Sequence, residues 1–533
     1  MSTQQFQTAR SDIDSGRAYL GIELGSTRIK AVLIAPNGDV LAGGEHQWEN
    51  RYENRLWTYS LEAVWEGIQR CYGALAEQVE LEYHTSLRQL AGIGISAMMH
   101  GYLAFDAQGQ LLVPFRTWRN TNTAVAAEQL SARFGCNIPL RWSIAHLWQA
   151  MLDNEEHVPQ LDRLTTLAGY VHWKLTGEFV LGVGDASGMF PIDSESGQYD
   201  AKLIASFDEL AGDRLGSRGL RALLPTVKPA GENAGFLSAD GARLLDPSGT
   251  LQAGIALCPP EGDAGTGMVA TNSVAVRTGN ISAGTSIFAM VVLERALRGA
   301  HAEVDLVTTP SGDPVAMVHC NNGASELGAW AEVFTQFATG LGHQVDATQV
   351  YATLFDAARQ GSPDAGGLLA YNNLSGEPIT GLSEGRPLLV RGPDSQLTLA
   401  NLMRSQLYAV FSTLSLGLRV LTEQGVQIET MHAHGGLFRT PGVAQQMLAA
   451  AIGTPVAVGQ GAGEGGAWGI AVLAAYMGSG AREDLADYLQ RQIFAATQPA
   501  VLAPQEADVV GYDSYLNRYS AGLAVQRAAT EAL

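Results

Sequence analysis

The sequence is poor in charged residues, and basic residues are the scarcer sign. Only 16% of its 533 residues are charged, compared with about 25% in average soluble chains, and 33 Lys and Arg stand against 53 Asp and Glu, a net charge of −20. A nucleic acid or an anionic membrane surface needs a basic footprint, which this balance does not provide. We therefore expect neither partner, whereas a nucleotide needs only a local pocket.

Cysteine and long apolar runs are also scarce. The four cysteines lie far apart and form no Cys-x-x-Cys pair, which argues against a zinc site or a disulfide framework. Residues 1–18 lack the apolar core of a signal peptide, and no run reaches the ~18 apolar residues of a transmembrane helix. We expect a cytoplasmic protein with free thiols.

What the chain does have is apolar material and glycine. Apolar residues make up 46% of the sequence, and the 61 glycines exceed the average share of about 7%. At roughly 150 residues per domain, the length suggests two to four domains. The composition predicts buried cores joined by tight turns and by pockets lined with backbone.

One local pattern occurs twice: an apolar strand, a turn of glycine with hydroxyl residues, and a second apolar strand. The first copy follows a polar tail (residues 1–16) and has strands at 19–23 and 29–35 around Gly25-Ser26-Thr27. The second has strands at 274–277 and 281–282 around a turn at Gly279-Asn280, then a turn at 283–286 and a strand at 287–293. The repetition suggests a duplicated α/β domain.

Helical and strand patterns alternate in the second half of the chain. Apolar periodicity predicts helices at 399–423, 443–452 and 467–477 and strands at 430–434 and 454–458. Residues 205–250 mix glycine, proline and charge, which predicts a loop-rich cap or insertion.

The two glycine–hydroxyl turns suit phosphate. Each exposes backbone N–H groups together with hydroxyls, which makes a concave anion site, and two of them facing across a cleft can hold one polyphosphate. The same residues also form ordinary hairpin turns. Glu23, in the first strand, favours the phosphate interpretation, because a carboxylate beside phosphates calls for Mg²⁺, commonly held through water. The alternative is a buried glutamate paired with Lys30 or Arg28.

These residues carry a family resemblance. Gly21-Ile-Glu-Leu-Gly-Ser-Thr-Arg-Ile-Lys30 resembles the opening signature of the FGGY carbohydrate kinases, which are ATP-dependent sugar kinases. Further segments resemble that family in the same order: a sugar-contacting strand and turn at 93–101, a catalytic-base segment at 262–267, the second phosphate hairpin at 279–286 and an adenosine site at 434–436. The order and spacing of the segments make the resemblance strong.

The resemblance implies an α/β fold with two actin-like (ribonuclease-H-like) domains, each a mixed sheet flanked by helices, with a cleft between them. It places the sugar site and the catalytic base in residues 17–270 and ATP binding in residues 271–533. The implied ligands are a sugar, ATP and Mg²⁺, with a homodimer as the possible assembly.

Asp263 is the general base that the resemblance implies. A sugar kinase needs a carboxylate to accept the hydroxyl proton, and the small neighbours of Asp263 let substrate and phosphate approach. Without this context it is an aspartate in a glycine turn. Glu23 stands where the family usually has Asp; the two carboxylates are the candidate metal ligands, directly or through water.

The candidate sugar-binding residues are Met99, His100, Trp118, Arg119 and Asp263. Met99 and His100 supply an apolar wall and one directional hydrogen bond, as in xylulokinases, or alternatively a core methionine and a structural histidine. Xylulokinases typically have Trp-Asn-Asp where this chain has Trp118-Arg119-Asn120, which favours a ribulokinase-like branch. The stretch 184–188 either lines the cleft or forms a plain turn.

Residues from both halves are candidates for ATP and phosphate binding: Gly25, Ser26, Thr27, Lys30, Gly284, Thr285, Ser286, Gly435 and Gly436. The stretch 461–466 also matches the dinucleotide fingerprint Gly-x-Gly-x-x-Gly. Because too little chain follows for a full dinucleotide domain, we interpret it as a loop flanking adenine.

The sequence therefore predicts phosphorylation of the terminal hydroxyl of a ketopentose by ATP. L-Ribulose is the favoured substrate and D-xylulose the alternative. Two other interpretations stay open: an actin-like ATPase switch without sugar chemistry, and a sugar-binding pseudo-kinase, the latter motivated by the departures at Glu23 and Arg119.

Overall fold

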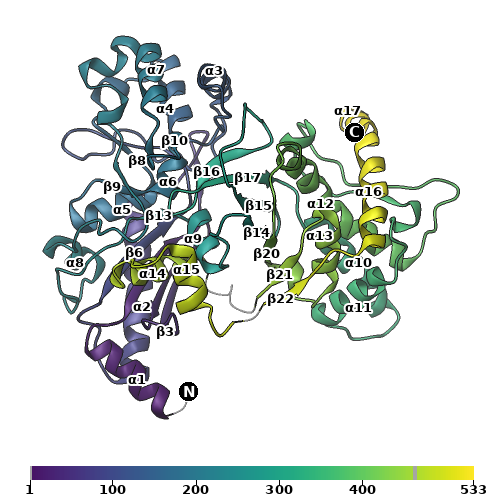
Figure 1. Cartoon of the computed structure of the whole chain (residues 1–533), viewed down its shortest axis with the longest axis horizontal. Helices are drawn as coiled ribbons and strands as arrows, with labels where there is room; N and C mark the ends of the chain where they lie inside the picture. The colour runs from purple at the N-terminus through teal and green to yellow at the C-terminus, as the bar shows by residue number, and fades with distance from the viewer. Residues whose placement is uncertain (1–2, 460–464, 498, 533) are drawn as a thin grey trace. The chain divides into compact units, whose positions relative to one another are not determined.

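The computed structural model describes residues 3–459, 465–497 and 499–532 and divides into two units. Unit 1 comprises Met1–Val274, Leu306–Val315 and Gly461–Ala496, and unit 2 comprises Ala275–Asp305, Ala316–Gln460 and Thr497–Leu533. The boundary predicted at residue 270 lies close to Val274, but two later segments return to unit 1. In Figure 1 the yellow-green α14 accordingly lies beside β6, from the first hundred residues.

Unit 1 is built on a five-stranded sheet with the order β13-β6-β1-β2-β3. Its strands are β1 (Tyr19–Leu24), β2 (Arg28–Ile34), β3 (Val40–Gln47), β6 (Gly92–Ala97) and β13 (Glu261–Gly262). Strand β1 pairs antiparallel with β2 and parallel with β6, and β13 pairs parallel with β6. The carboxyl ends of β1, β6 and β13 therefore meet at one edge of this sheet.

The helices of unit 1 are α1 (Thr3–Asp14), α2 (Leu61–Tyr83), α3 (Ala124–Phe134), α4 (Ser143–Leu152), α5 (Leu167–Thr176), α6 (Val183–Ser187), α7 (Ala201–Ala211), α8 (Ala239–Leu245), α9 (Asp263–Ala270), α14 (Gly465–Gly478) and α15 (Leu485–Tyr488). Its shorter strands are β4 (Arg51–Glu53), β5 (Leu56–Thr58), β7 (Leu103–Phe105), β8 (Arg163–Thr165), β9 (Val180–Gly182), β10 (Ile192–Asp193), β11 (Gln198–Tyr199) and β12 (Thr226–Lys228). The predicted loop-rich region thus holds most of α7, all of α8 and β12, with turns between them.

Helices α2 and α14 cover opposite faces of this sheet. A Cβ at Gly44 would collide with the Cys71 carbonyl in α2, and a Cβ at Gly21 would collide with the Ala467 carbonyl in α14. Only glycine allows a helix backbone to approach a strand this closely. Glu23 lies two residues after Gly21, so the alternation of side chains along a strand turns it toward α14 as well.

Residues 3–14, predicted as part of a polar tail, form helix α1. Phe6 stacks on Tyr83 of α2 with ring centroids 5.7 Å apart, and Ala9 and Ile13 are buried. The spacing of residues 6, 9 and 13 puts them on one helical face. Polar residues occupy the rest of the helix, which is why its composition is that of a tail.

The strands of unit 2 belong to a sheet with the order β16-β17-β15-β14-β20-β21-β22, in which most of β16 and the first residues of β17 fall in the segment Leu306–Val315. The strands are β14 (Thr278–Ala283), β15 (Ile287–Val292), β16 (Asp305–Thr308), β17 (Pro314–Cys320), β20 (Thr430–His434), β21 (Val456–Val458) and β22 (Ala500–Leu502), and β18 (Leu369–Tyr371) pairs separately with β19 (Leu388–Val390). Strand β14 pairs antiparallel with β15 and parallel with β20, as β1 does with β2 and β6. The duplicated pattern is present in both sheets.

Two strand-level predictions near the start of unit 2 are wrong. Residues 274–277 form no strand, because Arg277 has φ 65°, a left-handed conformation that interrupts an extended chain. Gly279 and Asn280 lie within β14, opposite Val291 and Met290, and not in a turn.

The helices of unit 2 are α10 (Ser325–Gly340), α11 (Ala347–Arg359), α12 (Leu399–Glu423), α13 (Val443–Ile452), α16 (Glu506–Ala521) and α17 (Leu523–Ala532). Helix α12 is buried over most of its length and packs against both α11 and α13. Tyr408 of α12 meets Tyr512 and Tyr515 of α16 at ring-centroid distances of 4.9 and 5.2 Å. This aromatic contact fixes α16 on the core of unit 2.

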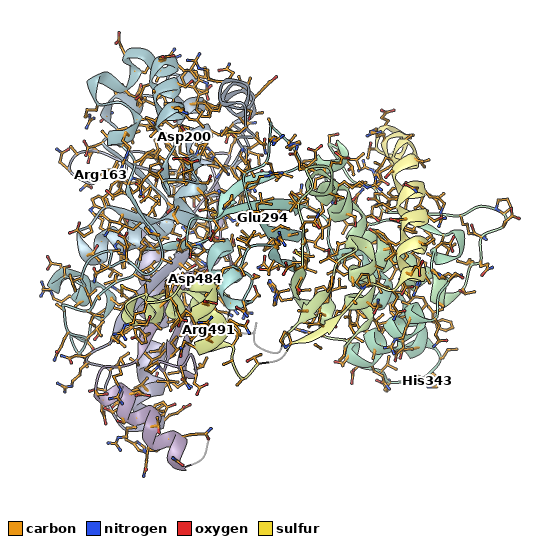
Figure 2. The ribbon with its side chains drawn as sticks, viewed as in Figure 1. Arg163, Asp200, Glu294, His343, Asp484 and Arg491 are labelled. Carbon is orange, nitrogen blue, oxygen red and sulfur yellow. The ribbon has the colours of Figure 1, made fainter. Side chains whose placement is uncertain are left out.

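Two aspartate side chains cap the N-termini of helices in unit 1. The two aspartates labelled in Figure 2 are N-caps: Asp200 accepts from the Lys202 backbone N–H at the start of α7, and Asp484 accepts from that of Asp487 in α15. Carboxylates at helix N-termini satisfy free N–H groups and favour the helix dipole. Among the helices of the described residues, none is long and apolar enough to cross a membrane.

Candidate active site

The predicted sugar and base residues meet at the carboxyl edge of the unit 1 sheet. The strand register pairs Glu23 with Ser96, and Ser96 with Glu261. Residues just beyond β6 and β13 therefore become neighbours, and the Met99 backbone N–H donates to Asp263 Oδ1 at 3.1 Å. Ligands of open α/β sheets bind at this edge.

Asp263 begins α9 and is partly buried. Burial raises the pKa of its carboxyl, while hydrogen bonds from the backbone N–H groups of Met99 and Ala264 act against that rise. A Cβ at Gly262 would lie 2.8 Å from Met99 Cγ, so glycine is needed where the chain enters the helix. The result is a fixed carboxylate that accepts protons more readily than a solvated aspartate.

Glu23 lies beside Asp263 and accepts a hydrogen bond at Oε2 from the Ala467 N–H at 3.1 Å. A Cβ at Gly466 would lie 2.6 Å from Oε1, so the start of α14 has room for this longer side chain. Burial first, and the charge of Asp263 second, raise the pKa of Glu23 to about 7, while Lys30 and backbone N–H groups lower it. Arg28 pairs with Glu45 at 3.4 Å.

Three aromatic donors hold the first glycine–hydroxyl turn. Trp48 Nε1 donates to the Gly25 carbonyl at 2.7 Å, Tyr59 Oη to the Ser26 carbonyl at 2.6 Å, and Trp118 Nε1 to Ser26 Oγ at 3.1 Å. The rings of Trp48 and Tyr59 stack with centroids 4.1 Å apart. Trp118, predicted to contact sugar, therefore contacts this turn. No sequence pattern around Trp48 or Tyr59 predicts that these side chains contact the turn.

The departure at Arg119-Asn120 has a structural explanation for one of its two residues. Asn120 is buried and bonds the Trp57 backbone twice, accepting its N–H at 2.9 Å and donating to its carbonyl at 2.8 Å. Arg119 is exposed, and its guanidinium lies 4.4 Å from the centre of the Trp57 ring, a cation–π contact. Asn120 therefore fixes β5, and sugar contact by Arg119 stays a prediction.

His100 has an unusual backbone. It is buried and has φ 71°, a left-handed conformation uncommon for residues other than glycine and often found at functional sites. Its Nδ1 lies 3.3 Å from the Gly188 carbonyl, and its ring stacks on Trp142 with centroids 6.4 Å apart. Met99 beside it is buried too, so the pair forms a shaped, largely apolar wall next to Asp263.

In unit 2, the second glycine–hydroxyl turn joins β14 to β15, as predicted. Its backbone is held by the loop after β17: the Gly323 N–H donates to the Thr285 carbonyl at 2.7 Å, and the Ala324 N–H donates to the Gly284 carbonyl at 2.8 Å. A Cβ at Gly323 would lie 2.5 Å from the Gly284 carbonyl oxygen. The turn therefore depends on that loop.

A buried carboxyl, Glu377, anchors the same loop. Its Oε2 accepts from the backbone N–H and the side-chain amide of Asn322, at 3.3 and 3.1 Å. Burial raises the pKa of Glu377 to about 7, whereas the hydrogen bonds from Asn322 lower it. Because the pKa of Glu377 is higher in the folded than in the unfolded protein, its protonated carboxyl stabilises the fold. This stabilisation is complete below pH ~4.5 and is lost as pH rises through about 7.

Glu377→Gln is therefore expected to match the wild type in stability at pH 5 and to exceed it at pH 8, by up to about 3 kcal/mol. The amide stays uncharged at both pH values. Melting temperatures of both proteins at pH 5 and 8 measure the effect, with Glu384→Gln, at an exposed position nearby, as the control. An identical pH slope in wild type and Glu377→Gln would contradict the expectation.

The two glycines that follow β20 differ in their surroundings. Gly435 has φ 111°, and a Cβ there would collide with the Ala283 backbone, whereas a Cβ at Gly436 would meet nothing within 4 Å. Gly435 is thus required by the fold, and Gly436 leaves open space over the backbone. Such space suits the close approach of a ribose or a phosphate.

We expect Gly435→Ala to lower the melting temperature by about 5 °C or more and Gly436→Ala to leave it unchanged. If Gly436 faces ATP, its methyl group raises the KM for ATP about tenfold without affecting stability. Thermal melts and ATP titrations of both variants test this. Equal destabilisation by the two substitutions would refute the difference in packing.

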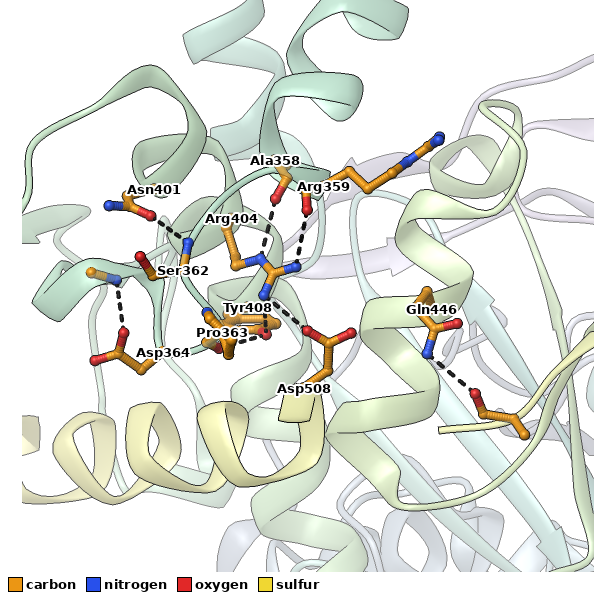
Figure 3. Close-up of polar contacts among 12 residues, drawn as sticks. Ala358, Arg359, Ser362, Pro363, Asp364, Asn401, Arg404, Tyr408, Gln446 and Asp508 are labelled. Atoms are coloured by element: carbon orange, nitrogen blue, oxygen red, sulfur yellow. Dashed lines mark hydrogen bonds and ion pairs between the residues drawn. The ribbon is translucent and has the colours of Figure 1, made fainter. Parts of the chain in front are cut away.

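A cavity of about 950 Å³ lies within unit 2 beside the predicted adenosine loop. Phe438, Pro441 and Gln446 contribute to its lining. Figure 3 shows its charged side: Arg404 donates to Asp508 at 3.0 Å and to the Ala358 carbonyl at 3.1 Å. Most of the fingerprint at 461–466 lies outside the described residues.

Comparison with known proteins identifies the family. Residues 18–247 match the N-terminal domain of the FGGY family of carbohydrate kinases, and residues 279–478 match its C-terminal domain. The chain belongs to the FGGY family of carbohydrate kinases. Its two actin-like domains, each a mixed sheet flanked by helices, are those of this family.

Several relatives of this FGGY chain are xylulose kinases. The Escherichia coli protein of that name is 27% identical over 225 residues, which is 40% of this chain and 45% of that protein. Structures of xylulose kinases from Lactobacillus acidophilus and Rhodospirillum rubrum have TM-scores of 0.78 and 0.76 at 16% and 20% identity. They cover 96% of this chain and 98% and 99% of their own. The sequence match to the Escherichia coli protein spans less than half of its length, whereas the fold is shared throughout.

Proposed function

We propose that this chain transfers the γ-phosphate of ATP to the terminal hydroxyl of a ketopentose, with Asp263 as the general base. The observation that carries the proposal is the carboxylate of Asp263, held by the Met99 N–H at the carboxyl edge of the sheet, next to His100. Its raised pKa and its place beside an apolar wall suit proton removal from a polyol.

The other roles follow from chemistry. Met99 and His100 orient the sugar, the turn Gly25-Ser26-Thr27 binds phosphate oxygens, and Lys30 supplies a positive charge. The turn around Thr285 and the backbone at Gly436 bind the nucleotide. Most of phosphoryl transfer consists of positioning and charge neutralisation, which these groups provide.

Glu23 and Asp263 fit a divalent cation. Both carboxyls have raised pKa values, and the charge of Asp263 contributes to the shift at Glu23, so a cation here would relieve repulsion. Mg²⁺ prefers one or two carboxylates with water and phosphate oxygens. When bound, it would neutralise charge on the transferred phosphate, and Glu23 and Asp263 would hold it directly or through water.

D-Xylulose is the substrate that we now favour, ahead of L-ribulose. The preference for L-ribulose depends mainly on Arg119-Asn120, with residues 141–143 and 184–188 in addition. The side-chain amide of Asn120 is bonded to the Trp57 backbone. The names of the relatives also support D-xylulose. Arg119 still favours another ketose.

An ADP-release assay with Mg-ATP tests the proposal against D-xylulose, L-ribulose, D-ribulose, L-xylulose, glycerol and gluconate. We expect turnover on D-xylulose that depends on the sugar. ATP hydrolysis without any sugar dependence would instead support an ATPase switch, and sugar binding without turnover would support a pseudo-kinase.

A further inference from the structure

A second buried carboxylate lies directly behind Asp263. Glu261 is two residues earlier in the chain, and only 1% of its surface is exposed. Its Oε1 accepts from the Gly184 N–H at 3.2 Å, and its Oε2 accepts from the Asp185 N–H at 2.9 Å. Glu261 therefore ties the strand that leads into Asp263 to a turn about eighty residues earlier.

This turn, residues 182–188, is helical: it consists of the end of β9, the short helix α6 and Gly188, not the plain turn that residues 184–188 could have formed. It has space for the Glu261 carboxylate. A Cβ at Gly182 would collide with Oε1 of Glu261, and a Cβ at Gly184 would collide with Oε2. Neither glycine has a positive φ, so their role is to leave space, not to permit an unusual backbone. Any other residue at either position would displace the carboxylate.

At its other end, the same turn determines which ring nitrogen of His100 carries a proton. The Gly188 carbonyl lies 3.3 Å from His100 Nδ1, and a Cβ at Gly188 would lie 2.6 Å from that atom. A carbonyl can only accept, so Nδ1 carries the proton in this contact. In the neutral ring Nε2 is then an acceptor, which is the form that takes a hydrogen bond from a sugar hydroxyl.

Asp185 anchors the middle of the turn. Its Oδ2 accepts from Thr166 Oγ1 at 2.6 Å, while its Oδ1 is buried without a hydrogen-bond partner among the described residues. That oxygen lies 3.3 Å from where a Cβ of Gly262 would stand, on the residue before Asp263. The turn therefore contacts Glu261 and Gly262, which precede the base Asp263, and it also contacts His100.

We propose that Glu261 is a positioning residue that holds the base Asp263 and the sugar-contacting His100 in one fixed arrangement through the turn 182–188. The proposal rests on the proposed function. Glu261 itself touches no substrate in this account. It acts by accepting two backbone N–H groups at once, one on each carboxyl oxygen.

Glu261→Gln tests the proposal with little change of shape. An amide accepts through one atom only and turns an N–H group toward the N–H of Gly184 or Asp185, which pushes the turn away. We expect kcat to fall about tenfold or more and the KM for ketose to rise about fivefold, with the KM for ATP unchanged. Glu178→Gln, an exposed glutamate just before β9, is the matched control and should behave as wild type.

Gly188→Ala probes the other end of the turn without altering Glu261. Its methyl group would press on His100 Nδ1, so we expect the KM for ketose to rise more than kcat falls. This variant keeps the proposal testable if Glu261→Gln does not fold. Wild-type kinetic constants in both variants would overturn the proposal while leaving the proposed function intact.

Calorimetric titration of ketose separates the positioning role of Glu261 from the proposed kinase activity. If the wild type phosphorylates no ketose, the proposed function fails, yet weaker ketose binding by Glu261→Gln than by Glu178→Gln would still support the positioning role. If Glu261 had a purely structural role, Glu261→Gln would lower the melting temperature but leave the ratio of the KM for ketose to the KM for ATP unchanged. That result would overturn the proposal.

Discussion

Asp263→Asn is expected to lower kcat for ketose phosphorylation by about 10³-fold, within the range that general-base catalysis supplies. The amide keeps the shape of the carboxylate and still offers Oδ1 to the Met99 N–H, but it cannot accept the hydroxyl proton. The KM for ketose should change little, because the wall formed by Met99 and His100 remains. Initial rates and sugar binding by the variant measure the two effects separately.

Asp240→Asn is the control for this variant, since its side chain is exposed on α8 of the same unit. Kinetics near wild type are expected there. If Asp263→Asn kept even a tenth of wild-type kcat, Asp263 would not be the base.

The raised pKa of Asp263 also fixes the direction of the pH profile. A general base works ionised, so kcat/KM should fall as pH falls through its folded pKa. Because burial raises that pKa, the acid limb should lie above the pH at which an ordinary aspartate titrates. This acid limb should be absent in Asp263→Asn, because the residual reaction of that variant does not depend on the ionisation of Asp263.

Glu23→Gln is the second substitution with a large expected effect. We expect kcat to fall about 100-fold and the Mg²⁺ concentration for half-maximal rate to rise about tenfold. An amide still accepts from the Ala467 N–H but offers no negative charge to a cation. Mg²⁺ titrations at saturating ATP and ketose measure this effect.

Two further variants sharpen the test of Glu23. Glu45→Gln removes an exposed charge from β3, next to Lys30 in the register, and should leave the Mg²⁺ requirement unchanged. Glu23→Asp restores the residue usual in the family and should retain activity. A Glu23→Gln variant with the wild-type Mg²⁺ dependence would assign Glu23 a structural role beside α14.

Protonation of Glu23 should act in the same direction as its substitution. Its pKa of about 7 means that the carboxyl gains a proton as pH falls through neutrality, so apparent Mg²⁺ affinity should decrease below pH 7. Bound Mg²⁺ favours the ionised form, which moves this transition to lower pH as the Mg²⁺ concentration rises.

Elements dominated by local periodicity could be predicted from the sequence. Helices α12 and α13 and strand β20 have the bounds that their apolar patterns indicate. Both glycine–hydroxyl turns were also predictable, since turn chemistry is local. Strand prediction failed at residues 274–277, where the left-handed Arg277 leaves no trace in hydropathy.

Only part of the candidate site could be predicted from the sequence. Asp263 and Met99 come together because both follow parallel strands, a relation that the motif order implies. Glu261 could not be singled out, because its role depends on contact with glycines about eighty residues away. Neither could the return of residues 461–496 to unit 1, which places Ala467 against Glu23.

A single-turnover experiment with γ-³²P-labelled ATP, Mg²⁺ and D-xylulose, run with wild type and Asp263→Asn side by side, tests directly whether Asp263 is the base of a ketose kinase. We expect that the wild type transfers label to the sugar and that the variant binds the sugar but transfers the label about 10³-fold more slowly. Equal transfer by the two proteins, or label released only as phosphate by the wild type, would contradict this expectation.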